Sequence, residues 1–209
     1  MEQIEKLPFF NKVTAGVALG KSGQNLDYWI KTRLKSGEII ALKKGLFASK
    51  YYLIALQADF RLREKYLQYL ARIIYQPSYL SLEYVLSLKN LIPEAIYSYT
   101  SISLKTTRDF KNKLGKYNYQ TIKDDLFGGF EVIEFDGGKR IRIATKAKAL
   151  FDFLYLKKIK NLDLLKYEIN EGLRINWLEF DKNDIKEFKR FAMISNSSKM
   201  KSIVKIMKW

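Results

Sequence analysis

The sequence contains no cysteine and no histidine. Without thiol or imidazole groups the chain cannot form a disulfide, a zinc site with those ligands, or a nucleophile activated by histidine. General acid–base chemistry would fall to Asp, Glu, Lys or Tyr side chains. These absences argue against most hydrolase mechanisms, and we expect a protein that is not an enzyme and uses no metal and no cofactor.

Long apolar runs are also missing. No segment approaches the roughly 20 apolar residues that span a bilayer, and the opening residues MEQIEKLPFF lack the basic-then-apolar order of a signal peptide. We therefore expect a cytoplasmic protein without a membrane partner. With 209 residues, 47% of them hydrophobic and 29% charged, the chain has the composition of a globular protein of one or two domains.

Acidic residues are few relative to basic ones. The chain has 38 Lys and Arg against 22 Asp and Glu, which gives a formal net charge of +16. This imbalance favours a polyanionic partner such as nucleic acid. Because the positive charge is spread along the whole chain, it does not locate a binding face, and local sequence patterns must do so.

The N-terminal quarter of the chain predicts two short helices followed by a hairpin. One helix over residues 13–19 ends at Gly20, and a second over 24–36 ends at Gly37, where a left-handed C-cap is wanted. The segment EIIALKKGLFAS then has apolar residues on both sides of a Lys-Lys-Gly turn, as in a β-hairpin. This order is that of a winged helix-turn-helix, which we place at residues 1–55.

The second helix has two different faces. Leu26, Ile30 and Leu34 form an apolar stripe that should pack on the preceding helix. The opposite face carries only hydrogen-bond donors and no acid: Gln24, Asn25, Tyr28, Lys31, Thr32 and Lys35. An amide near a helix N-terminus suits adenine, and lysine suits guanine or phosphate. We predict that these six residues bind DNA together with Lys43 and Lys44 at the hairpin turn.

Two binding roles other than DNA recognition remain open from these patterns. Helix–helix–hairpin units also serve as protein-docking modules, and amides and lysines are common on solvated helix faces. The aromatic-rich segment Tyr75–Tyr99 could stack on the bases of single-stranded RNA. Aromatic residues at helical spacing are more often part of a core, which is the interpretation we favour.

The remaining residues, 56–209, predict a mixed α/β domain with a helical C-terminal end. Helical patterns cover 53–75, 146–155, 162–171 and 181–193, and strand patterns cover 97–107, 117–122 and 130–145. A further helix is expected between Pro77 and Pro93, with Ser78 or Ser81 as its cap. A basic connector separates the first two strands, and Asp136-Gly137-Gly138 predicts a hairpin turn in the third pattern. The tail SSKMKSIVKIMKW predicts an amphipathic helix packed on the domain. The fold class expected is therefore α+β.

Three segments of this second part follow one another in a recognisable order. QPSYLSLEYVLSLKNLIPEAIYSYTSISLKTTRDF has a Pro-Ser-Tyr entry at Pro77, an Ile-Pro-Glu helix end at Ile92–Glu94, and a Ser/Thr-rich strand. GKYNYQTIKDDLFGGFEVI and IATKAKALFDFLYLKK come next. Together with the hairpin they resemble AbiEi-family antitoxins, the regulatory half of abortive-infection toxin–antitoxin operons, over roughly residues 13–158.

The resemblance implies a winged helix that represses its own operon at inverted repeats of double-stranded DNA. It also implies a C-terminal domain that counters a nucleotidyltransferase-like toxin without requiring a stable complex, and we expect a monomer or weak dimer. The family's Ala-x-Pro-Glu-Lys-Ala-Leu-x-Asp-x-x-Tyr pattern places candidate toxin-countering residues at Lys148, Asp152 and Tyr155, whereas Lys146 and Ala147 replace its proline and glutamate. Because Lys148 and Asp152 are four residues apart, a surface ion pair is the simpler interpretation.

A metal-dependent or degenerate nuclease is the third hypothesis. Glu131, Glu134, Asp136 and Lys139 lie close together in one strand pattern, and carboxylates with a lysine at a strand end can surround Mg²⁺. The acidic-x-Lys tripeptide usual in such enzymes is absent. We interpret Asp136 as a turn residue and the two glutamates as solvated strand residues.

Overall fold

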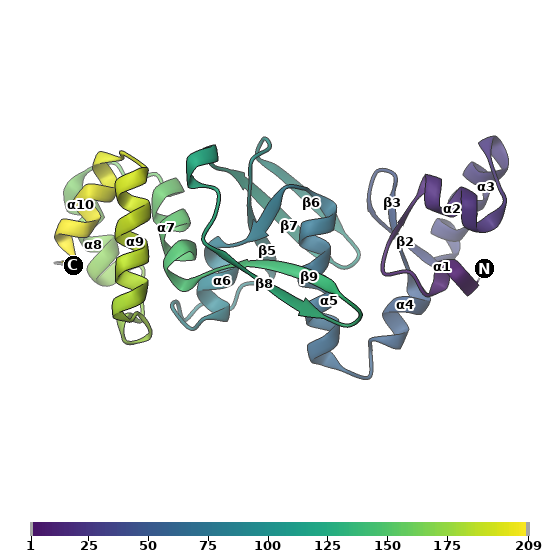
Figure 1. Cartoon of the computed structure of the whole chain (residues 1–209), viewed down its shortest axis with the longest axis horizontal. Helices are drawn as coiled ribbons and strands as arrows, with labels where there is room; N and C mark the ends of the chain where they lie inside the picture. Colours follow the sequence, from purple (N-terminus) through teal and green to yellow (C-terminus); the bar gives the residue numbers. More distant parts are fainter. Residues whose placement is uncertain (1, 208–209) are drawn as a thin grey trace. The chain divides into compact units, whose positions relative to one another are not determined.

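The computed structural model describes residues 2–207, with the side chains of Glu2 and Leu162 excepted, and has a mixed α+β fold (Figure 1). The chain forms two compact units. The first contains residues up to Leu70 together with Phe110–Lys116, and the second contains the rest. The division falls inside one helix, whereas we placed the boundary after residue 55 from the sequence.

The first unit combines short helices with a small antiparallel sheet. Its elements in chain order are α1 (Glu2–Glu5), β1 (Phe10–Asn11), α2 (Lys12–Leu19), α3 (Gly23–Ser36), β2 (Ile39–Lys43), β3 (Leu46–Ser49) and α4 (Lys50–Ala55). The three strands form an antiparallel sheet in the order β1-β3-β2. The predicted helix pair and hairpin are confirmed, and α3 ends at Gly37 with a φ of 77°, as expected of a left-handed cap.

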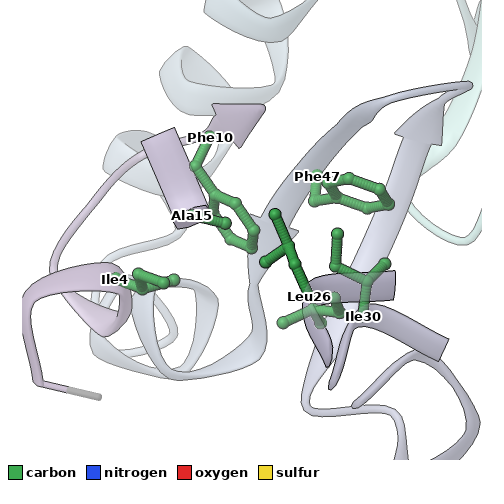
Figure 2. Packing of buried hydrophobic residues seen from close by; sticks show 7 residues of the cluster. Ile4, Phe10, Ala15, Leu26, Ile30 and Phe47 are labelled. Carbon is green, nitrogen blue, oxygen red and sulfur yellow. The ribbon is translucent and has the colours of Figure 1, made fainter. Parts of the chain in front are cut away.

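The core of the first unit lies where α2 and α3 meet the three-stranded sheet. Its buried members are Ile4, Phe10, Ala15, Leu26, Ile30, Ile39 and Phe47, of which Figure 2 labels six. Phe10 and Phe47 face each other across β1 and β3, with ring centroids 5.7 Å apart. The apolar stripe of α3 is therefore turned into this core.

The helix predicted over residues 53–75 is wrong as a single element. It is replaced by α4 and α5 (Phe60–Ile74), with a turn between them. The Asp59 carboxylate accepts hydrogen bonds from the amides of Arg61 and Leu62, at 2.8 and 3.1 Å, and so caps a new helix start. Apolar periodicity runs through both helices, and the capping residue alone marks the break.

The second unit contains most of a six-stranded sheet in the order β6-β7-β5-β4-β9-β8, of which only Phe110–Lys116, the end of β6 and the start of β7, is assigned to the first unit. Its strands are β4 (Ser78–Leu80), β5 (Ser98–Ser103), β6 (Arg108–Asn112), β7 (Gly115–Thr121), β8 (Phe130–Phe135) and β9 (Lys139–Ala144). Its helices are α6 (Leu82–Leu88), η1 (Asp124–Leu126), α7 (Lys146–Leu156), α8 (Leu162–Tyr167), η2 (Glu168–Gly172), η3 (Trp177–Glu179), α9 (Lys182–Ile194) and α10 (Ser198–Ile206). The hairpin turning at 136–138 is confirmed between β8 and β9.

Two strands of this sheet contradict the sequence prediction. Residues 78–80, which would open a helix capped by Ser78, form β4, which pairs with β5 on one side and in parallel with β9 on the other. The helix begins after Ser81, the other cap that the sequence predicts. A three-residue strand buried along its whole length shows no alternation that could identify it. Residues 108–112, assigned to a connector, form the edge strand β6, where exposed basic side chains are a common feature of natural sheets.

The aromatic segment 75–99 contributes to the core, as favoured from its spacing. Tyr75, Tyr79, Tyr84 and Tyr99 are all buried, and Tyr97 is exposed. The C-terminal tail forms α10, which buries Met200 and Ile203 against the unit. The predicted packing of this helix is therefore confirmed. The aromatic segment 75–99, in turn, offers no row of exposed rings for stacking on bases.

Candidate nucleic-acid interface

The turn between α2 and α3 brings the two helices very close together. A side chain at Gly16 would place its Cβ 3.0 Å from the carbonyl oxygen of Lys21 and 3.3 Å from Leu26 Cδ2. The amide of Lys21 donates to the Gly16 carbonyl at 3.0 Å and fixes the chain in this turn. A side chain here would crowd the turn, so glycine at position 16 favours the close approach of α3 to α2.

All six predicted contact residues of α3 are exposed. Gln24 and Asn25 lie in its first turn, Tyr28, Lys31 and Thr32 in its middle, and Lys35 near its end. The Tyr28 side chain is 74% exposed although it is aromatic. The structure therefore places these six side chains on one solvent-facing surface, opposite buried Leu26 and Ile30.

The flanking charges of α3 are engaged elsewhere. Arg33 pairs with Glu38 and lies 5.9 Å over the Trp29 ring, so its guanidinium stays at the side of the helix. The Ser36 hydroxyl donates to Glu38, and this bond, aided by Arg33, lowers the pKa of the Glu38 carboxyl. Glu38 is therefore an ionised partner of α3 and does not face the exposed surface.

Asp27 is the one acid within α3, and its charge is compensated. Its carboxylate lies 2.5 Å from the ammonium of Lys12 at the start of α2. The two side chains are 50% and 59% exposed to solvent, so the pair contributes little to stability. Its consequence is electrostatic, because it leaves Lys31 and Lys35 as the uncompensated charges on the outer face.

The hairpin β2–β3 carries the two predicted wing lysines at its turn. Lys44 is exposed, whereas Lys43 is half-buried beside a register shift between Ala41 and Lys43. All four residues of β3 are buried, so the hairpin is anchored along one strand. Lys44 is thus the wing lysine whose ammonium is freely available to a phosphate.

Sequence reasoning missed other exposed groups beside this surface. Lys21 and Ser22 lie in the turn immediately before α3, and both are exposed. Val13 and Val17, on α2, are 74% and 82% exposed although they are apolar. A basic residue inside the interhelical turn was the available signal for Lys21. Helical spacing alone could not place the two valines outside the core.

The candidate toxin-countering residues of α7 lie inside the second unit. Lys148 and Asp152 form an ion pair whose side chains are both 0% exposed, so the surface ion pair inferred from their spacing is wrong. Tyr155 is half-buried and stacks on Phe151, with ring centroids 5.5 Å apart. Neither charged side chain reaches a surface that a partner could touch.

Hydroxyl groups from β4 and the residue after it complete this buried site. Tyr79 and Ser81 donate to the same oxygen of Asp152, at 3.0 and 2.7 Å. Burial raises the pKa of Asp152 and lowers that of Lys148, while their mutual attraction opposes both shifts. Burial and the adjacent carboxylate raise the pKa of Tyr79 far above its usual range, so its hydroxyl remains a donor.

Aromatic rings and a glycine enclose the Lys148 side chain. Its ammonium lies 5.6, 5.0 and 4.7 Å from the ring centroids of Tyr79, Phe151 and Phe191. A Cβ at Gly129 would come within 2.9 Å of Lys148 and within 2.8 Å of the Phe191 ring. The site is therefore a closed structural network that holds α7 and α9 against the sheet.

The acids of the β8–β9 hairpin form no cluster. Asp136 pairs with Lys139 at 2.8 Å within the turn, and Glu134 pairs with Arg140 at 3.5 Å. Glu131 and Glu134 are exposed, as expected for solvated strand residues. Over residues 2–207 no group of three or more acidic side chains is placed to hold a metal ion.

Comparison with models of known protein families and with curated proteins found no match for this chain. Within the described residues, no helix is both long enough and apolar enough to pass through a membrane.

Proposed function

We propose that the first unit is a winged helix-turn-helix that binds duplex DNA with α3 in the major groove. The observation that carries this proposal is the exposed face of α3, which presents six hydrogen-bond donors and no uncompensated acid. Major-groove base edges offer acceptors that amides and lysines recognise, and lysines also contact phosphates. The wing would place Lys44 against the adjacent backbone.

We propose further that the protein is an antitoxin that represses its own operon and counters a nucleotidyltransferase-like toxin. This step depends on the resemblance to AbiEi-family antitoxins. Because Lys148 and Asp152 are buried, we assign them to maintaining the second unit and not to contacting the toxin. Any contact with a toxin would involve other, exposed residues.

Binding to the DNA upstream of its own gene tests the proposal directly. The purified protein is titrated into this DNA and into scrambled DNA of equal length, at salt concentrations from about 50 to 200 mM. We expect tight binding to the upstream DNA and binding several decades weaker to the scrambled sequence. Equal and steeply salt-dependent binding to both would mean that only the net charge of +16 is acting.

Asn25→Ala and Lys31→Ala are each expected to weaken binding to the upstream DNA by about 1–3 kcal/mol, roughly 5- to 150-fold. Both side chains are exposed, so neither change should unfold the protein. Lys6→Ala removes one positive charge, as Lys31→Ala does, but from an exposed position outside α3, and it serves as the control. If the two α3 variants bind as tightly as Lys6→Ala, the assigned face is wrong.

Lys44→Ala is expected to lower the salt dependence of binding without changing the sequence preference. Each phosphate that a lysine neutralises adds about 0.9 to the slope of log K against log salt. The variant should therefore lose about one unit of slope on upstream and scrambled DNA alike. An unchanged slope would place the wing away from the DNA backbone.

Protein docking by the first unit is the second candidate function, favoured by the exposed Val13 and Val17. Single apolar residues are common on surfaces, but two of them one helical turn apart form a small apolar patch. The double variant Val13→Ser/Val17→Ser tests whether this patch takes part in DNA binding. If α3 is the DNA interface, the variant should bind upstream DNA as tightly as the wild-type protein does.

A further inference from the structure

Helix α9 separates its charged residues onto two faces. Phe188, Phe191 and Ala192 are buried, and the first two pack their rings against Phe151 of α7. Figure 1 shows α9 beside α7 and α10. The acids Asp184 and Glu187 turn the same way. Asp184 pairs with Lys146 of α7 at 3.0 Å, and Glu187 forms a hydrogen bond with Thr145.

The outward face of α9, which we name the α9 basic face, has no acid. It lines an open hollow of about 510 Å³ and consists of Lys182, Ile185, Lys186, Lys189, Arg190, Met193 and Ile194. Four of these residues are cations and three are apolar. Met193 is 73% exposed, which is high for an apolar side chain on a packed helix.

The lysines of this face form no ion pair with the part of the chain that the structure describes. Across residues 2–207, Lys182, Lys186 and Lys189 make no ion pair. Lys182 and Lys186 are four residues apart, as are Lys186 and Arg190, and like charges at this spacing repel each other. The stripe therefore weakens the helix that carries it, and an anionic partner would relieve the repulsion.

The interleaving of cations with apolar side chains identifies the class of partner. A nucleic-acid backbone would satisfy the lysines but leave Met193 and Ile194 without apolar contacts. A second copy of this chain would bring two basic faces together. Met and Arg are enriched at the centres of protein interfaces, and the unbranched Met side chain adapts to different shapes.

We propose that the α9 basic face docks an acidic amphipathic helix of a partner protein. Its glutamates or aspartates would meet Lys182, Lys186 and Lys189, and its apolar residues would cover Met193 and Ile194. Ridges along the exposed side of α9 offer the groove in which such a helix packs. The face belongs to the second unit, so the proposal does not depend on DNA binding by α3.

The test measures binding of the full-length protein to a defined probe by fluorescence anisotropy. The probe is a labelled helical peptide of about 18 residues, with Leu on one face and Glu on its flanks. Its control is a scrambled peptide of the same composition, which has no apolar face. We expect binding to the ordered peptide that is at least about tenfold tighter than to the scrambled one.

Charge reversal locates the site. The variant Lys182→Glu/Lys186→Glu/Lys189→Glu should weaken binding of the ordered peptide by at least about tenfold, because like charges then face each other. The control reverses three exposed lysines elsewhere in the second unit, at Lys158, Lys160 and Lys166. It has the same net charge and should lose less than about threefold. Met193→Ser, which keeps every charge, should weaken binding by about fivefold.

Four results would overturn the proposal. The ordered peptide could fail to bind, or both peptides could bind equally, which would leave net charge as the only cause. The two triple variants could lose affinity equally. Finally, duplex DNA could displace the peptide and itself lose affinity only in the α9 triple variant, which would make this face a nucleic-acid contact. Binding of upstream DNA by the wild-type protein is measured separately, so failure of the α9 proposal remains distinct from failure of the α3 proposal.

Discussion

Asp152→Ala is expected to destabilise the protein by about 3–5 kcal/mol. The change leaves the Lys148 ammonium buried without its counter-charge, since both side chains are fully enclosed. It also removes the acceptor of the Tyr79 and Ser81 hydroxyls. A buried donor without an acceptor costs about 1–3 kcal/mol of its own. Urea unfolding followed by far-ultraviolet circular dichroism measures the loss as a lower midpoint.

Two further variants test the physical cause of this loss. Lys148→Met/Asp152→Leu removes both charges at similar volume, and such replacements of buried ion pairs are often neutral or stabilising. We expect it to recover the part of the loss in Asp152→Ala that comes from the unpaired Lys148 ammonium, whereas the part that comes from the Tyr79 and Ser81 hydroxyls remains because leucine accepts no hydrogen bond. Glu134→Ala removes a partner from the exposed pair with Arg140 and should cost less than about 1 kcal/mol. Equal small losses in Asp152→Ala and Glu134→Ala would show that the Lys148–Asp152 pair is open to water.

The buried pair also shows why its environment could not be predicted from the sequence. Lys148 and Asp152 are one turn apart on α7, and that spacing is equally compatible with a surface and a core position. Their burial is decided by hydroxyls from Tyr79 and Ser81, which lie 73 and 71 residues from Asp152 along the chain. Those hydroxyls are in place because residues 78–80 form a central strand, and that strand is too short to leave a recognisable pattern.

The candidate DNA-binding face could be predicted because it depends on local periodicity alone. In α3 the positions of Leu26 and Ile30 fix which side is buried, so the opposite residues follow by geometry. The compensation of Asp27 by Lys12 could not be foreseen, since it requires the angle between α2 and α3. The α9 basic face falls between these cases. Its lysine spacing is visible in the sequence, but only the packing of α7 shows where the acids of α9 turn.

Leu26→Ala is expected to destabilise the first unit by about 2–5 kcal/mol. Leu26 is only 4% exposed and packs within the cluster that contains Phe10, Ile30 and Phe47. Alanine would leave a cavity where α3 meets α2, at the point where Gly16 permits their close approach. Folded domains are stable by only about 5–15 kcal/mol in total, so the loss is a large part of what holds the unit together.

Hydrogen exchange of the α3 amides, followed by mass spectrometry, measures this loss where it occurs. The control is Asn25→Ala, the neighbouring exposed residue, whose effect on stability should stay within about 0.5 kcal/mol. The pair separates two routes to weaker DNA binding. Leu26→Ala should accelerate exchange and weaken binding by unfolding the helix, whereas Asn25→Ala should weaken binding with exchange unchanged. If Leu26→Ala left exchange unchanged as well, the apolar stripe of α3 would not face the core, and the outer face assigned to DNA would be misplaced with it.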